Sequence, residues 1–347
     1  STRVMSNWKR WTDSPLNSQF ADIERPDHIV YPDLRDGSPL VLGSDYSGEH
    51  ALPEFRVLSF LLTTYKSITA WEPLRTSVRK MHLADGRRMS FKALNDAMRI
   101  NALPSFLGAA SQLNGVLVCV GVEKGYSLSQ DNLPLLEHDW VADPLQKLLE
   151  ICVFGGIVID GLRGVGQNVH WITDDDAIVS TEKAQLDAMN LMGGILHKYS
   201  DEHLEVALGI ASKFDDERRA EDLVAIPDLA AGAFSETLTT IGKSSMPTSG
   251  SGPRDTGLFI QIKSTLINAW RSEAGKPLKH MNAVIRIAGG GQTLVSFGSP
   301  LSRILRPGES TEGAPTLNSK WRRALEAYMK RCGIDRAEVL KSMGIDA

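Results

Sequence analysis

The stretch PLVLGSDYSGEH, residues 39–50, decides how the rest of the chain is interpreted. Its apolar residues 40–42 are typical of a buried strand, and the chain then reaches the carboxylate of Asp45 and a Ser-Gly turn. Asp, Ser and Gly are common turn formers, so the strand could end in an ordinary turn. Alternatively, Asp45 binds a metal ion at the end of a sheet. Companion residues elsewhere in the sequence must decide between these interpretations.

Length and composition limit the class of protein. The chain has 347 residues, 42% of them hydrophobic, which predicts two domains or one large domain with extensions. The net charge of −4 requires any nucleic-acid-binding surface to be local. Three distant cysteines form neither a zinc motif nor a disulfide framework. The longest apolar run, 151–159, is too short to cross a bilayer. We therefore expect a cytoplasmic protein with no membrane partner.

The order of apolar patterns predicts an α/β fold. Strands are predicted at 40–46, 55–65, 67–81, 115–124, 168–179 and 204–212, and helices at 90–113, 143–160, 181–199 and 226–241. The run at 115–124 is continuously apolar, as in a strand buried on both faces. Three strands followed by alternating helices and strands predict a mixed sheet with helices on its faces.

Prolines and polar residues mark where these elements begin or break. Pro73 makes 67–81 a weaker strand at an edge, and Pro104 is expected to interrupt its helix. Asp143 and Thr181 are placed to cap two helices, and Pro227 is placed in the first turn of another.

The predicted domain organisation has three parts. Residues 1–38 form an N-terminal extension, 39–245 the α/β domain, and 246–347 a C-terminal accessory region. The stretch 242–257 is rich in Ser, Gly and Pro and is typical of a boundary. Beyond it we predict the following elements: a helix at 258–271, a hairpin at 283–297 turning on 289–291, and a helical tail at 318–342.

Carboxylates recur where predicted elements begin or end. Asp45 ends the first strand, Asp174–Asp176 end a later strand, and Asp228 lies in the first turn of a late helix. Such positions gather at one edge of an open sheet. Crowded carboxylates raise one another's pKa, and a divalent cation removes that cost. Mg²⁺ prefers oxygen ligands, and two such ions can cleave a phosphodiester. Each aspartate alone is equally typical of a turn, a solvated strand end or a helix N-terminus.

Three short motifs carry a resemblance to a known superfamily. With Asp45 on the first strand, the order of elements over roughly 39–241 resembles the ribonuclease H-like fold. VHWITDDDAI (169–178) is similar to that fold's fourth strand, where a Thr-Asp pair ends the strand and the Asp, here Asp174, binds metal. DYSG (45–48) and AIPDLAAG (225–232) resemble an uncharacterised bacterial branch, in which Asp228 matches the last-helix aspartate.

The resemblance implies a nuclease that uses Mg²⁺ or Mn²⁺. Asp45, Asp174 and Asp228 would be catalytic metal ligands, with Asp176 as a further ligand. The branch commonly has Glu where this chain has Tyr46. For the superfamily's second carboxylate, on or before the first helix, the chain offers Asp96 as a catalytic candidate, with Glu72 and Glu49 as substitutes.

Basic clusters suggest how nucleic acid, DNA or RNA, would bind. The clusters lie at 75–82, 85–92 and 320–331, the last with Trp321 and Tyr328. The predicted phosphate-binding residues are Arg79, Lys80, Arg87, Arg88, Lys92, Arg322 and Arg323. The tail cluster equally suits an amphipathic helix docked on its own domain.

The sequence therefore predicts a divalent-metal-dependent nuclease. The alternative is a catalytically incomplete ribonuclease H-like protein that binds nucleic acid or assembles with a protein partner or a second copy of itself. A small-molecule enzyme is disfavoured because the chain carries no cofactor loop.

Overall fold

A computed structural model describes most of the chain between residues 31 and 298. The described residues are 31–47, 54–128, 136–198, 204–214, 217–244, 262–273, 275–287 and 293–298. The N-terminal extension up to residue 30, the hairpin turn at 289–291 and the helical tail at 318–342 lie outside them.

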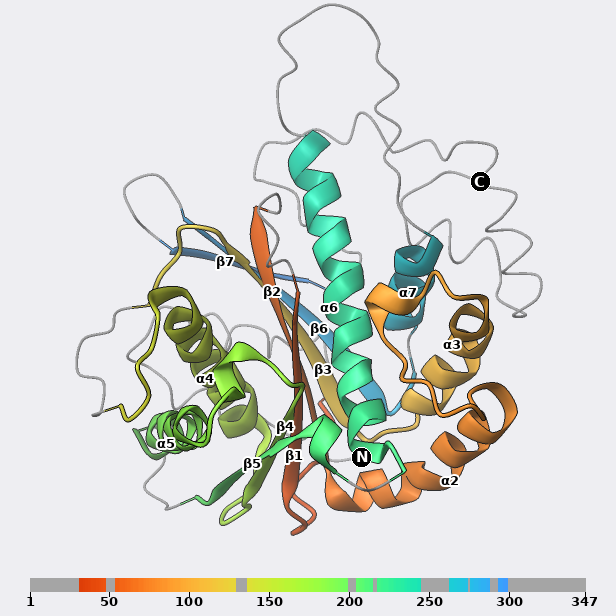
Figure 1. The fold of residues 1–347 in the computed structure, drawn as a ribbon, viewed down its shortest axis with the longest axis horizontal. Coiled ribbons are helices and arrows are strands. Elements are labelled where there is room, and N and C mark those ends of the chain that lie inside the picture. Colours follow the sequence, from red (N-terminus) through yellow and green to blue (C-terminus); the bar gives the residue numbers. More distant parts are fainter. Residues whose placement is uncertain are drawn as a thin grey trace, which may run out of the picture.

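A mixed sheet forms the centre of the fold (Figure 1). Its strands are β1 (Leu40–Ser47), β2 (Phe55–Thr64), β3 (Gly115–Glu123), β4 (Val169–Thr173), β5 (Val206–Ile210), β6 (Leu278–Ile287) and β7 (Thr293–Gly298). They are arranged in the order β5-β4-β1-β2-β3-β6-β7. β1, β2 and β3 form an antiparallel meander, β4 and β5 continue parallel to β1, and β6 runs parallel to β3. The predicted mixed α/β fold is confirmed.

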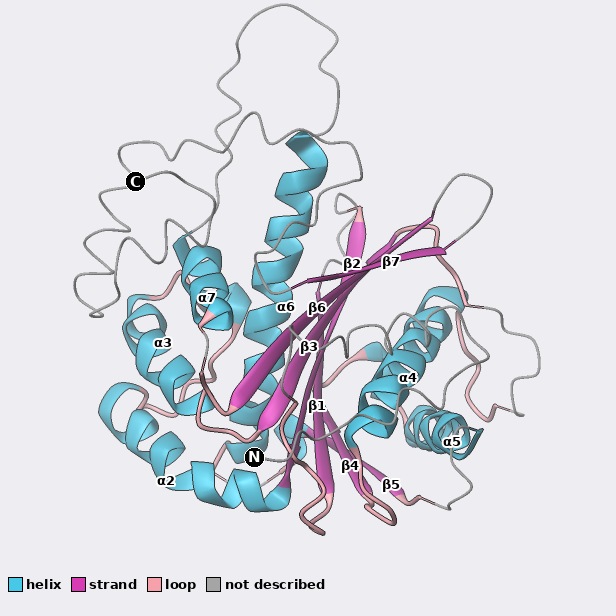
Figure 2. Ribbon diagram, turned by 180° about the vertical axis from the view of Figure 1, so that it is seen from behind, coloured by secondary structure: helices cyan, strands magenta, loops and turns pink. Residues whose placement is uncertain are grey.

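Helices cover both faces of the sheet (Figures 1 and 2). They are α2 (Tyr65–His82), η2 (Phe91–Ala93), α3 (Ala97–Ala110), α4 (Ala142–Leu162), η3 (Ala177–Val179), α5 (Glu182–Lys198), η4 (Ala211–Lys213), α6 (Arg219–Ser244) and α7 (Ile262–Ser272). α4 and α5 pack on one face, whereas α2, α3, α6 and α7 pack on the other. Each face has its own apolar core, because side chains alternate along the strands.

The region predicted as a third strand, 67–81, is a helix, and that prediction was wrong. Thr64 caps α2 by accepting a hydrogen bond from the Ser67 backbone N–H at 3.2 Å. Ile68, Trp71 and Val78 recur at helical spacing and are buried. Pro73 lies on the exposed side of the helix and does not end it.

Three other helix boundaries differ from the prediction. α6 begins at Arg219, so Pro227 lies inside it rather than in its first turn. α4 begins at Ala142, and Asp143 lies in its first turn rather than at the cap. The predicted helix 90–113 is broken before α3, where Asp96 caps the new helix, and not at Pro104. The cap on Thr181 is confirmed, because its hydroxyl accepts from the Ala184 N–H at 3.1 Å.

The sheet also includes strands from the predicted accessory region. β6 and β7 belong to residues 246–347, yet β6 pairs with β3 from Gly115 to Val122. β6 and β7 form the predicted antiparallel hairpin. Strands from both sides of the predicted boundary at 245 therefore belong to one sheet. Within the described residues, no helix is both long enough and apolar enough to cross a membrane.

α6 lies very close to the sheet and to the segment before α3. A Cβ atom at Gly232 of α6 would overlap the Phe91 ring of η2. At Gly121 of β3 it would lie 2.6 Å from the Leu238 side chain of α6. Gly232 leaves the space that the rigid Phe91 ring fills, and Gly121 leaves space for the end of the Leu238 side chain.

We expect Gly232→Ala to destabilise the protein by about 1–3 kcal/mol, because the added methyl group overpacks the contact with Phe91. Gly194→Ala is the matched control, since Gly194 lies in helix α5 with open space around its Cβ position. That change should be neutral or stabilising by up to about 1 kcal/mol. Urea unfolding of both variants measures the difference, and equal stabilities would contradict the packing.

Candidate functional site

Asp45 lies on β1 on the face that α6 covers. Val41 and Asp45 share this face with Gly43, whose Cβ position would be 3.6 Å from the Leu223 carbonyl of α6. The Asp45 residue is 8% exposed. Among the described residues, its carboxylate accepts no hydrogen bond and forms no ion pair. A buried carboxylate without a partner is energetically costly, so this side chain marks a site that requires a cation or a proton.

Asp174 reaches the same edge of the sheet from β4. β1 and β4 are parallel and in register, with Ser44 opposite Thr173, so that Asp174 follows directly at the carboxyl end. One Asp174 oxygen, Oδ1, accepts from the Asp175 N–H at 2.9 Å. The other, Oδ2, accepts from Arg88. Both oxygens of Asp174 therefore have partners within the chain.

Asp228 projects from α6 and holds the segment before α3. Its Oδ2 accepts from the Phe91 N–H at 2.8 Å. Gly232, one turn further along α6, leaves room for the Phe91 ring. Asp228 is thus fixed between a helix and a loop.

The three side chains Asp45, Asp174 and Asp228, here called the carboxylate cluster, lie within one another's electric fields. Burial raises the pKa of Asp45 well above its ordinary range, and the charges of Asp228 and Asp174 raise it further. Arg88 and Lys147 oppose this rise. Burial also raises the pKa of Asp228, with a contribution from Asp174. The structure thus brings together three of the predicted site residues.

Two cations border the carboxylate cluster. Arg88 forms an ion pair with Asp174. Lys147 of α4 pairs with Asp176 at 2.5 Å and lies 4.7 Å from the centre of the Tyr46 ring. Asp176, a predicted metal ligand, is therefore placed beside the cluster and paired with a lysine.

Tyr46 belongs to a hydrogen-bond network on the opposite face of β1, which the sequence analysis did not anticipate. Its hydroxyl lies 2.7 Å from Ser44 Oγ and 3.2 Å from Thr173 Oγ1. The Trp171 ring N–H donates to Ser44 Oγ at 2.7 Å. The network ties β1 to β4 directly behind the cluster. The sequence could have indicated this position, because neighbouring residues of a strand point to opposite faces of the sheet and Tyr46 follows Asp45.

Asp96 is not brought into the carboxylate cluster. It caps α3 by accepting from the Met98 N–H at 3.0 Å, and it pairs with Arg87 and with Arg99 at 2.7 Å. The substitute Glu72 pairs with Arg75, and Glu49 lies outside the described residues.

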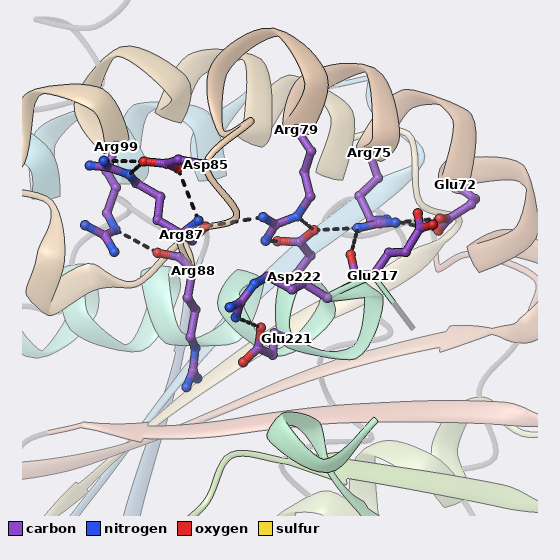
Figure 3. Close-up of polar contacts among 11 residues, drawn as sticks. Glu72, Arg75, Arg79, Asp85, Arg87, Arg88, Arg99, Glu217, Glu221 and Asp222 are labelled. Carbon is purple, nitrogen blue, oxygen red and sulfur yellow. Dashed lines mark hydrogen bonds and ion pairs between the residues drawn. The ribbon is translucent and has the colours of Figure 1, made fainter. Parts of the chain in front are cut away.

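Most of the predicted phosphate-binding arginines are neutralised internally, and Figure 3 shows Arg79 beside Asp222. Arg79 pairs with the fully buried Asp222, Arg87 with Asp85 and Asp96, and Arg88 with Asp174. In contrast, Lys80 and Lys92 are exposed and form no ion pair with the described part of the chain. Arg322 and Arg323 lie outside it.

The described residues contain no group of three or more His, Cys, Asp or Glu side chains arranged to hold a metal ion. The carboxylate cluster thus supplies suitable donor atoms without presenting them to a common centre. A scan against protein-family models and a search of curated proteins each found no match to the chain.

The raised pKa of Asp45 predicts a pH-dependent stability. The folded state binds the Asp45 proton more tightly than the unfolded state, so ionisation of Asp45 destabilises the fold as pH rises above about 3.9. Asp45→Asn should therefore be more stable than wild type at pH 7 without divalent ions, and this advantage should shrink toward pH 4. Thermal unfolding across this range tests the prediction. Asp175→Asn, an exposed neighbour, should show no such trend.

Proposed function

We propose that the chain is a divalent-metal-dependent nuclease of the ribonuclease H-like kind, which hydrolyses phosphodiester bonds at the carboxylate cluster. One observation carries the proposal: the buried Asp45 carboxylate has no partner among the described residues, yet it lies close to two further aspartates, Asp174 and Asp228. An arrangement that destabilises its own charge in this way is more typical of a functional site than of a structural one.

The sheet order supports this assignment. β1 and β2 are antiparallel, and β4 and β5 continue parallel to β1, so the strands that carry Asp45 and lead to Asp174 are neighbours. The third strand of the meander is β3, which follows α2 and α3, so the order of elements differs at 67–81 from the one on which the resemblance rests. Ligands of open sheets bind beyond the carboxyl ends of the strands, where neighbouring connections diverge. Asp45 near the end of β1 and Asp174 just after β4 meet that condition.

The donor chemistry fits Mg²⁺ or Mn²⁺. Asp45, Asp174 and Asp228 would hold the ion or ions, because carboxylate oxygens are the ligands these cations prefer. When bound, such ions activate a water molecule and stabilise the leaving oxygen in phosphodiester cleavage. Within the chain, the Tyr46 network holds β1 against β4, and Asp228 is fixed against the Phe91 N–H. Lys147 fixes Asp176 beside the cluster.

The second candidate is a catalytically incomplete protein that binds nucleic acid. It is favoured by a specific observation: both Asp174 oxygens are already engaged, and Asp96 is directed to Arg87 and Arg99 instead of the cluster. Such a protein would retain its phosphate contacts and lack cleavage.

The decisive experiment is cleavage of labelled single- and double-stranded DNA and RNA with Mn²⁺ or Mg²⁺. We expect wild-type protein to cleave at least one substrate and Asp45→Asn to lose at least 100-fold in rate, because Asn keeps the shape of Asp and removes its charge. Asp175→Asn, an exposed carboxylate next to Asp174, should retain activity. Binding without cleavage by the wild-type protein would establish the second candidate.

Phosphate binding by the exposed lysines predicts a change in salt dependence. The slope of log affinity against log salt should be shallower by up to about 2 in Lys80→Ala/Lys92→Ala, since each phosphate contact contributes about 0.9 on duplex DNA. Lys183→Ala, an exposed lysine on α5 across the sheet, is the control. Filter binding or fluorescence anisotropy at several salt concentrations gives the slopes. An unchanged slope in the double variant would place the interface elsewhere.

A further inference from the structure

The residues 83–96 between α2 and α3, here called the connecting segment, cover the carboxylate cluster through specific polar contacts. Arg88 pairs with Asp174, while the Phe91 N–H donates to Asp228. Two of the three carboxylates are thus held by one short segment. The third, Asp45, feels the Arg88 charge without bonding to it.

The backbone around Arg88 is fixed from the side away from the sheet. Arg99 Nε donates to the Arg88 carbonyl at 2.7 Å, and Arg79 Nη1 donates to the Arg87 carbonyl at 3.2 Å. Arg79 is itself held by the buried Asp222. Figure 3 shows the Arg88 side chain extending toward the sheet, away from those of Arg87 and Arg99. The bonds to the backbone at Arg87 and Arg88 therefore direct the Arg88 guanidinium into the carboxylate cluster.

The Arg88 guanidinium only partly satisfies the site it enters. Its Nε is buried and has no hydrogen-bond partner within the described ranges of the chain. Its single positive charge faces the three carboxylates of the cluster. A planar guanidinium binds one carboxylate well. A divalent ion, in contrast, can be coordinated by several carboxylates at once. The side chain is 28% exposed, so it has access to solvent if released.

We propose that Arg88 is a built-in counter-ion of the carboxylate cluster, which a divalent cation displaces from Asp174 so that the freed guanidinium can bind a phosphate of the nucleic acid. This inference rests on the proposed function, because it specifies how the same site accepts its metal. It accounts for the cluster having suitable donor atoms but no preformed ion site: one donor, Asp174, is occupied by Arg88.

The test is Mn²⁺ binding measured by isothermal titration calorimetry on the full-length protein, without substrate. We expect Arg88→Ala and Arg88→Gln to bind Mn²⁺ about tenfold more tightly than wild type, since no hydrogen bond to a charged group must be broken. Arg88→Lys keeps the charge but loses the planar fork of the guanidinium. Its Mn²⁺ affinity should therefore lie between that of wild type and those of the Ala and Gln variants. Arg87→Ala is the matched control, since Arg87 pairs with Asp85 and Asp96 outside the cluster.

Circular dichroism and thermal unfolding establish that each variant is folded, and the Gln and Lys variants preserve the test if Arg88→Ala is unstable. Equal or weaker Mn²⁺ binding by the folded Arg88 variants would overturn the inference. An effect of equal size in Arg87→Ala would also overturn it, by reducing it to general electrostatics. Tighter Mn²⁺ binding without nuclease activity in any variant would support the counter-ion role while refuting the proposed nuclease. Absence of Mn²⁺ binding in all proteins would refute both.

Discussion

The close approach of α6 to the sheet is the constraint on which both the core and the site depend. Gly121 and Gly232 remove the side chains that would separate the helix from β3 and from η2. Because the helix lies so near, Asp228 faces Asp45, and burial of both carboxylates raises their pKa values. The apolar face of the same helix fills one of the two cores. The packing of α6 on the sheet therefore places buried carboxylates close together and raises their pKa values at this edge of the sheet.

A chain of charges connects this packing to the outer helices. Asp222 of α6 is fully buried and binds both Arg75 and Arg79 of α2. Arg79 then reaches the backbone of the connecting segment. Buried ion pairs of this kind contribute little net stability, because both charges lose their hydration. Removing one partner is nevertheless costly, because it leaves the other charge buried and unpaired. Their evident consequence is orientation: α2, α6 and the segment bearing Arg88 are held in one arrangement.

The sequence was informative where one physical effect dominated. The continuously apolar β3 could be recognised, as could the convergence of Asp45 and Asp174, because the carboxyl ends of parallel strands share an edge. The sequence did not predict α2, because its buried residues are separated by many polar ones and because proline, here Pro73, is uncommon inside a helix. The partners of the arginines could not be predicted, since Arg88 meets Asp174 across 86 positions and Arg79 meets Asp222 across 143. Only the tertiary fold creates those pairs.

The order of the strands also bears on how the protein is made. The antiparallel meander β1-β2-β3 comes first in the chain, whereas its flanking neighbours β4 and β6 are synthesised much later. During translation, both edges of the meander therefore present unpaired backbone groups while most helices that cover it are still missing. Open strand edges are templates for association between chains. We expect the nascent protein to depend on chaperones until β4 and β6 have been synthesised. The yield of folded protein in cells should then depend more on the rate of synthesis than on the stability of the finished fold.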